Sequence, residues 1–139
     1  DRASSVYGPR DLEDRVVSKF FANALRGEPL NVNGEHERLD FSFVTDVAQG
    51  ISLAATKDAA KNEIFNITYG EDDTILNAAR LVKTLTGSDS EIVLCDKNPI
   101  MPSRGYLDIR KARYLLDYKP KYSIEQGFPL YHEWLKDPF

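Results

Sequence analysis

The chain has 139 residues, of which 42% are hydrophobic and 29% are charged, as is ordinary for one soluble globular domain. Its formal net charge of −4 argues against a general nucleic-acid surface and against binding to an anionic membrane. A phosphate-bearing ligand must therefore be held by local arginines, against the overall charge.

The cysteine and histidine content indicates the compartment. Cys95 is the only cysteine, so it cannot form an internal disulfide, and no His and Cys residues have the spacing of a metal site. No apolar run approaches the roughly 20 residues that a membrane span needs. We therefore expect a cytoplasmic protein with no metal site, no membrane span and no nucleic-acid partner.

The first part of the chain is predicted to contain a strand end, a helix and a strand. Residues 3–7 are typical of the end of a strand, and apolar residues recur at helical spacing over residues 12–26. Gly27 is the expected end of this helix. A short strand is predicted at residues 30–32.

Residues 38–47 read R-L-D-F-S-F-V-T-D-V and predict a strand that leads into a helix. A period of two places Leu39, Phe41 and Phe43 on one face of a strand over residues 39–44, and Asp40 and Ser42 on the other. Thr45 is the expected N-cap of a helix over residues 46–57, with Asp46 in its first turn. We interpret Asp40 and Asp46 as turn and capping groups rather than catalytic acids.

The remainder is predicted to contain two strands and three helices, the strands at residues 63–67 and 92–95 and the helices at 75–86, 109–116 and 124–136. Thr74 and Asp108 are expected N-caps, and Ser123 forms a capping-box pattern with Gln126. Because strands and helices alternate, we expect an α/β fold. The strands are few and short, which fits part of a larger sheet better than a complete one.

Five motifs occur in order along the chain: S-S-V-Y-G-P-R at 4–10, G-E-P-L-N-V-N-G at 27–34, R-L-D-F-S-F-V-T-D-V at 38–47, F-N-I at 65–67, and a tail with R-G-Y-L-D-I-R-K-A at 104–112 and L-L-D-Y-K-P-K-Y-S at 115–123. Together they resemble the C-terminal part of the NAD-dependent epimerase/dehydratase family, the extended short-chain dehydrogenases that include UDP-glucose 4-epimerases. The resemblance implies that residues 1–139 are one C-terminal substrate-binding lobe, with a strand and a helix that belong to a missing Rossmann domain.

The motifs that carry the chemistry of that family are absent from the sequence. A dinucleotide-binding loop needs glycines about three residues apart, whereas the closest pair here is Gly27 and Gly34. In the family, a tyrosine with a lysine four residues later acts as the base, and none of the seven tyrosines has a lysine at that spacing. We therefore expect no catalytic residue in this chain. The resemblance implies that NAD is bound by an N-terminal Rossmann domain of the parent enzyme, not by this fragment.

The resemblance also implies how a nucleotide-diphosphate sugar is bound. The predicted substrate-binding residues are Ser5, Val16, Val17, Asn31, Asn33, Arg38 and Arg104. In the family, backbone groups of this lobe recognise the pyrimidine, which places the base near Val16, Val17 and residues 31–33. The simpler interpretation is that these segments only pack against their neighbours.

Two phosphates require cationic donors, and arginine offers two parallel ones. Arg104 is the first candidate, because the family's closing segment carries a phosphate-contacting arginine near this point; a solvated surface arginine is the alternative. Arg38 is the second, since many relatives have an arginine at the next position, where Leu39 stands here. Ser5 occupies a position that is often an asparagine in contact with the substrate.

Two functional hypotheses follow. The first is the nucleotide-sugar-binding portion of an NAD-dependent epimerase or dehydratase, whose parent oxidises the sugar transiently with bound NAD. The second is a non-catalytic, stand-alone interaction module derived from that lobe. The sequence leaves open the sugar, the base, and the choice among epimerase, dehydratase, decarboxylase and reductase. The resemblance is compatible with a homodimeric parent.

Overall fold

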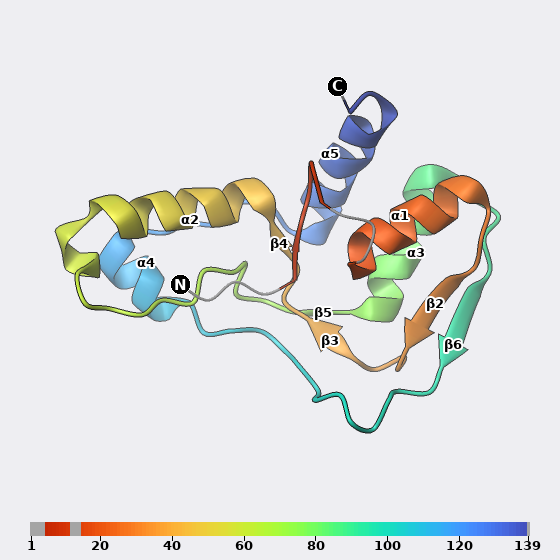
Figure 1. The fold of residues 1–139 in the computed structure, drawn as a ribbon, viewed down its shortest axis with the longest axis horizontal. Helices are drawn as coiled ribbons and strands as arrows, with labels where there is room; N and C mark the ends of the chain where they lie inside the picture. Colours follow the sequence, from red (N-terminus) through yellow and green to blue (C-terminus); the bar gives the residue numbers. More distant parts are fainter. Residues whose placement is uncertain (1–4, 12–14, 139) are drawn as a thin grey trace.

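Short strands and helices alternate along the chain in a computed structural model that describes residues 5–11 and 15–138 (Figure 1). The helices are α1 (Val16–Arg26), α2 (Val44–Thr56), α3 (Ile75–Thr86), α4 (Arg110–Leu116) and α5 (Ile124–Lys136), with a 3-10 turn η1 (Asp58–Ala60). The strands are β1 (Val6–Tyr7), β2 (Leu30–Asn33), β3 (Arg38–Leu39), β4 (Ser42–Phe43), β5 (Asp73–Thr74) and β6 (Ile92–Cys95). This is a mixed α/β fold, as the alternation predicts.

In the described part of the chain the strands pair two by two. β1 pairs with β4 and β2 with β6, both in parallel, while β3 pairs with β5 in antiparallel fashion. Two-stranded pairs are marginal in water unless they pack against other elements. The helices therefore carry most of the packing here.

Buried apolar side chains form two separate clusters. The larger lies among α1, α3, α5 and β2, and its aromatic centre includes Phe21 and Phe128, whose ring centroids are 5.8 Å apart. The smaller joins α2 and α4 through residues such as Phe65, Leu116 and Tyr118. Figure 1 shows α2 and α4 together at one end of the molecule, away from α1 and α3.

Several predicted helix boundaries are confirmed. Gly27 and Gly87 follow α1 and α3 in the left-handed conformation, with φ of 71° and 62°. Glycine adopts this conformation without the steric cost of a Cβ. Thr74 caps α3 by accepting a hydrogen bond from the Asn77 N–H at 3.0 Å, and the Ser123 capping box opens α5.

The single strand predicted at residues 39–44 is wrong, because the segment forms two short strands with different partners. β3 pairs with β5, and β4 pairs with β1. Asp40 and Phe41 between them are buried and belong to no strand, so the alternation of an outer and an inner face does not hold. The Asp40 side chain instead binds backbone amides of other segments.

Two further helix starts differ from the predictions. α2 begins at Val44 with Phe43 at the N-cap position, so Thr45 lies inside the helix and does not cap it. α4 begins at Arg110, one residue later than predicted, although the Asp108 carboxylate does accept the Arg110 N–H at 2.9 Å. Residues 3–4 and 12–14 of the first predicted strand and helix lie outside the described residues.

The strand predicted at residues 63–67 is also wrong, since only an isolated bridge forms there, at Asn66. Phe65 and Ile67 are buried in the smaller cluster, as an apolar strand would be, but Ile64 is 61% exposed. Packing of two side chains thus replaces strand pairing. None of the helices in the described ranges has the length and hydropathy of a membrane span.

Candidate functional site

Two adjoining pockets lie where β3, the start of α1 and residues 96–104 meet. The first, of about 590 Å³, is lined by β3, the first residue of α3 and segment 96–104. The second, of about 460 Å³, is lined by Ser5, Val6 and the start of α1. Both are lined by Leu39, Met101 and Arg104, so they meet at these residues. Volumes of this size suit small organic ligands.

The structure brings together six of the seven predicted substrate-binding residues. Asn33 and Arg38 line the first pocket, Ser5, Val16 and Val17 line the second, and Arg104 lines both. Asn31 lines neither of them. It is exposed on β2, between the buried Leu30 and Val32.

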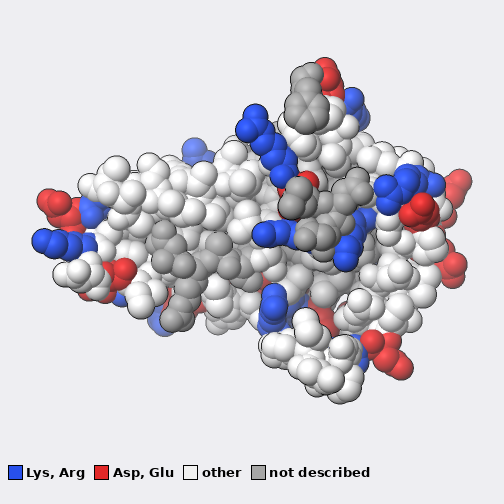
Figure 2. All heavy atoms as spheres, in the orientation of Figure 1, with Lys and Arg blue, Asp and Glu red and all other residues white. Residues whose placement is uncertain are grey.

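Positive charge is local rather than general. Figure 2 shows Lys and Arg side chains across the middle of one face of the molecule, with Asp and Glu mainly towards its edges. A net charge of −4 is therefore compatible with a cationic area that could receive an anion.

Two of the cations that line the first pocket already have carboxylate partners. Arg38 Nε lies 2.7 Å from Asp72 Oδ1, and Lys97 Nζ lies 3.2 Å from Glu37 Oε1. An anionic ligand would have to compete with these carboxylates for either cation. The nearby Asp72 is therefore a specific obstacle to the predicted phosphate-binding role of Arg38.

Arg104 differs from these two cations. Its side chain is exposed at the junction of the pockets, and within the described ranges it has no hydrogen bond or ion pair. Its guanidinium group can therefore meet a ligand without first losing a carboxylate partner. Leu39 adds apolar surface to both pockets.

Asp40 organises the loops beside the site. It is fully buried, and its carboxylate accepts hydrogen bonds from the backbone N–H groups of Tyr69, Gly70 and Leu107 at 3.1 to 3.2 Å. Burial raises the pKa of Asp40 above its ordinary value, while these backbone donors oppose the shift. The sequence predicts that Asp40 acts in a local turn. In the structure it instead joins its own segment to residues 69–70 and 107, which are distant in the sequence.

Asp46, in the first turn of α2, also accepts hydrogen bonds from distant backbone groups. It is 3% exposed and accepts from the backbone N–H groups of Lys121 and Tyr122 at 3.0 and 2.9 Å. These contacts fix the approach to α5. The prediction that Asp46 lies in the first turn of a helix is confirmed, but its main partners lie outside that helix.

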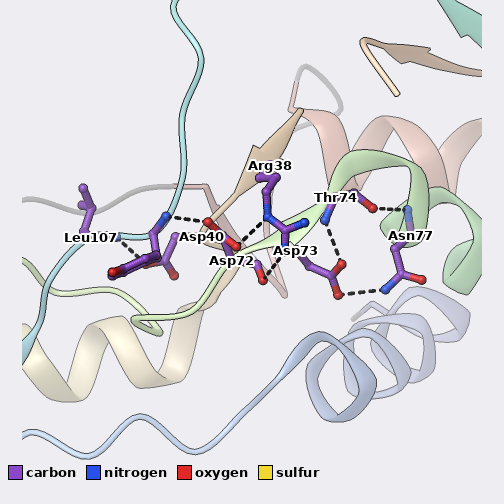
Figure 3. Close-up of polar contacts among 8 residues, drawn as sticks. Arg38, Asp40, Asp72, Asp73, Thr74, Asn77 and Leu107 are labelled. Carbon is purple, nitrogen blue, oxygen red and sulfur yellow. Dashed lines mark hydrogen bonds and ion pairs between the residues drawn. The ribbon is translucent and has the colours of Figure 1, made fainter. Parts of the chain in front are cut away.

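Sequence reasoning missed Asp72, which binds Arg38 (Figure 3) and also accepts a hydrogen bond from the Tyr106 N–H. Neither partner lies near it in the sequence, so no capping or turn pattern points to it. Its neighbour Asp73 does have a local signal, since it accepts from Asn77 four residues later, at 2.8 Å.

The described residues do not fit a dinucleotide cofactor. Such a site needs a glycine-rich turn between a strand and a helix. Here β4 and β5 pass directly into α2 and α3 with no intervening residue, and the loops before α1 and α4, residues 8–15 and 96–109, contain only one glycine each in the sequence. Within residues 5–11 and 15–138, no group of three or more His, Cys, Asp and Glu side chains could hold a metal ion.

Comparison with known proteins gives a consistent result. A family model described as the NAD dependent epimerase/dehydratase family matches residues 2–68. The chain is 36% identical over 129 residues to UDP-glucuronic acid decarboxylase 1 of Xenopus tropicalis, a match that covers 91% of the chain and 30% of that protein.

Solved structures agree with this similarity. UDP-glucose 4-epimerase of Thermotoga maritima, solved with UDP-glucose, is 34% identical with a TM-score of 0.89, covering 97% of this chain and 44% of that one. UDP-glucuronic acid 4-epimerase of Bacillus cereus, in complex with UDP-glucuronic acid and NAD, is 26% identical with a TM-score of 0.89 and covers 99% and 45%. The chain thus spans less than half the length of the proteins it matches.

Proposed function

Because the chain belongs to the NAD-dependent epimerase/dehydratase family, we propose that it is the nucleotide-sugar-binding portion of a larger epimerase, dehydratase or decarboxylase. The parent enzyme oxidises a sugar carbon transiently with NAD held by another part of the protein. Residues 1–139 form its C-terminal substrate-binding lobe, and their role is to bind and orient the nucleotide sugar. The names of the relatives favour uridine as the base.

Arg104 is the observation that carries this proposal. It stands at the junction of two pockets with its guanidinium group free of carboxylate partners in the described part of the chain. A diphosphate placed there can accept two parallel N–H bonds, which are stronger than bonds between neutral groups. The paired state of Arg38 and Lys97 makes Arg104 the best available ligand for a phosphate.

The second pocket is suited to the nucleoside. Val16 and Val17 provide apolar surface at the start of α1, and the Ser5 hydroxyl adds one polar group. Asn33 lies at the end of β2 on the other side of Arg104. In this proposal the chain holds the ligand by its nucleotide, while the sugar extends towards the cofactor domain of the parent enzyme.

We expect residues 1–139 by themselves to bind UDP weakly, with a Kd of about 1 mM, because the proposal assigns to them only part of the cleft. Arg104→Ala should weaken this affinity about tenfold, whereas uridine binding should change little, since uridine has no phosphate. NMR titration measures both affinities. Arg26→Ala is the matched control, because Arg26 is exposed and lines neither pocket. An equal UDP affinity in the Arg104 variant would contradict the proposal.

The chain alone should neither bind NAD nor convert UDP-glucose. The described residues do not fit a dinucleotide, and the sequence has no tyrosine with a lysine four residues later. NAD titration and a coupled epimerisation assay on the purified chain check this. Turnover by the chain would refute the assignment. Absence of UDP binding together with cooperative unfolding of a monomer would instead favour a stand-alone interaction module.

A further inference from the structure

We propose that Asp72 is a positioning residue for Arg104, a proposal that rests on the proposed binding role of Arg104. Asp72 lies just before β5, and its side chain is mostly shielded from solvent. Within the described ranges, no hydrogen bond or ion pair joins Asp72 to Arg104. It acts instead through the backbone of the segment that carries this arginine.

The contacts of Asp72 connect two sides of the first pocket (Figure 3). Its Oδ1 accepts from Arg38 Nε at 2.7 Å, and its Oδ2 accepts from the Tyr106 N–H at 3.0 Å. Arg38 Nη2 also donates to the Asp72 carbonyl oxygen, at 3.4 Å. One carboxylate therefore fixes β3 to the backbone two residues after Arg104.

Gly105 allows this close approach. A Cβ atom at position 105 would lie 3.1 Å from Asp72 Oδ2, which is tighter than most real contacts. The glycine thus lets the chain pass directly over the carboxylate. The backbone after Arg104 thus comes close enough for the Tyr106 N–H to donate a hydrogen bond to Asp72.

The segment around Arg104 needs such anchors, because residues 102–109 belong to no helix or strand. On the N-terminal side, the Ser103 hydroxyl donates to Glu37 Oε1 at 3.1 Å. On the C-terminal side, Asp72 holds Tyr106, and Asp40 holds Leu107 at 3.1 Å. Carboxylates therefore hold the Ser103 side chain before Arg104 and the backbone after it, and leave the Arg104 side chain available for a ligand.

The same carboxylate also keeps Arg38 engaged. Among the described residues, Arg38 is paired with Asp72 and Lys97 with Glu37, whereas Arg104, the third cation that lines the first pocket, has no carboxylate partner. Asp72 thus has a double effect. It orients the segment of Arg104, and it keeps Arg38 paired, so that in the described part of the chain Arg104 is the cation of this pocket that remains available to an anion.

Replacement of Asp72 tests this role. In Asp72→Ala, we expect the Tyr106 amide to exchange its hydrogen about tenfold faster, because it loses its acceptor. With Arg38 also replaced by alanine, so that an unpaired Arg38 cannot bind the phosphate instead, UDP affinity should fall about fivefold relative to Arg38→Ala alone, and uridine affinity should not change. For Asp72→Asn, the Tyr106 exchange rate and the UDP affinity should lie between those of the unmodified chain and those of Asp72→Ala. The asparagine amide oxygen can still accept a hydrogen bond from one of the two donors. Asp89→Ala is the control, as Asp89 is exposed and lines neither pocket.

A double-mutant cycle separates positioning from general destabilisation. In the Arg104→Ala background, Asp72→Ala should cause no further loss of UDP affinity, because the residue that it positions is gone. Equal losses in both backgrounds, or unchanged Tyr106 exchange, would overturn the proposal. Absence of UDP binding by the unmodified chain would contradict the proposed function itself, and the exchange at Tyr106 would still decide whether Asp72 holds the segment.

Discussion

Asp40→Ala should lower the free energy of unfolding by about 4 kcal/mol. The substitution removes a fully buried carboxylate and leaves the backbone N–H groups of Gly70 and Leu107 without their acceptor, while the Tyr69 N–H keeps the Ser42 hydroxyl oxygen at 3.0 Å. A buried donor without a partner costs about 1 to 3 kcal/mol, and water that enters the new cavity offsets part of the sum. Since domains are stable by only about 5 to 15 kcal/mol, this loss is large. Urea unfolding followed by circular dichroism measures it.

The control for this experiment is Asp89→Ala, in which an exposed carboxylate is removed from a loop. Surface substitutions of this kind change stability by no more than about 0.5 kcal/mol. If Asp40→Ala changed the free energy of unfolding by as little, the hydrogen bonds from the Asp40 carboxylate to residues 69–70 and 107 would not contribute to stability. Hydrogen exchange at the Gly70 and Leu107 amides should rise together in the variant, because one group holds both.

Gly127→Ala should destabilise the chain by about 2 kcal/mol, although alanine is the better helix former. Gly127 lies in the first turn of α5, and a Cβ there would collide with the Tyr7 hydroxyl and lie 2.9 Å from Tyr7 Cζ. Tyr7 is 1% exposed and packs edge-on against Phe128, with ring centroids 4.9 Å apart, so its ring has little room to move. Overpacking costs about 1 to 3 kcal/mol, against a helix-propensity gain of about 1. Thermal unfolding of the variant is the measurement.

Tyr7→Phe provides the test of that mechanism. The Tyr7 hydroxyl is buried without a hydrogen-bond partner in the described part of the chain, so its removal should by itself stabilise the protein by about 1 kcal/mol. Combined with Gly127→Ala, it should recover part of the lost stability, because the closest clash is gone. Strictly additive effects of the two substitutions would show that they do not meet.

Much of the local structure could be predicted because its signals lie within a few residues. The ends of α1 and α3 follow from Gly27 and Gly87, and the start of α3 follows from Thr74, which caps a backbone amide three residues away. The Ser123 capping box has the same short range. Failures occurred where partners are distant. The strand predicted at 39–44 divides because its two halves pair with β5 and β1.

The candidate site shows the same division. Motif order places six of the predicted residues around two adjoining pockets, with Asn31 as the exception. The engagement of Arg38 was not foreseeable, since its partner Asp72 is 34 residues away. A carboxylate that far along the chain gives no periodic or capping signal. The competition between Asp72 and a phosphate for Arg38 becomes visible only in three dimensions.

The sequence by itself determined the family motifs, the α/β alternation, the absence of a Tyr-Lys pair and of a glycine-rich loop, and the helix ends. These depend on residue identity and short spacing, which folding does not alter. Only the tertiary structure decided what the aspartates do. Asp40 reaches backbone donors 29 to 67 residues away, and Asp72 reaches Tyr106 across 34. Buried N–H groups need acceptors wherever the fold places them, and the packing of distant segments selects which carboxylate serves them.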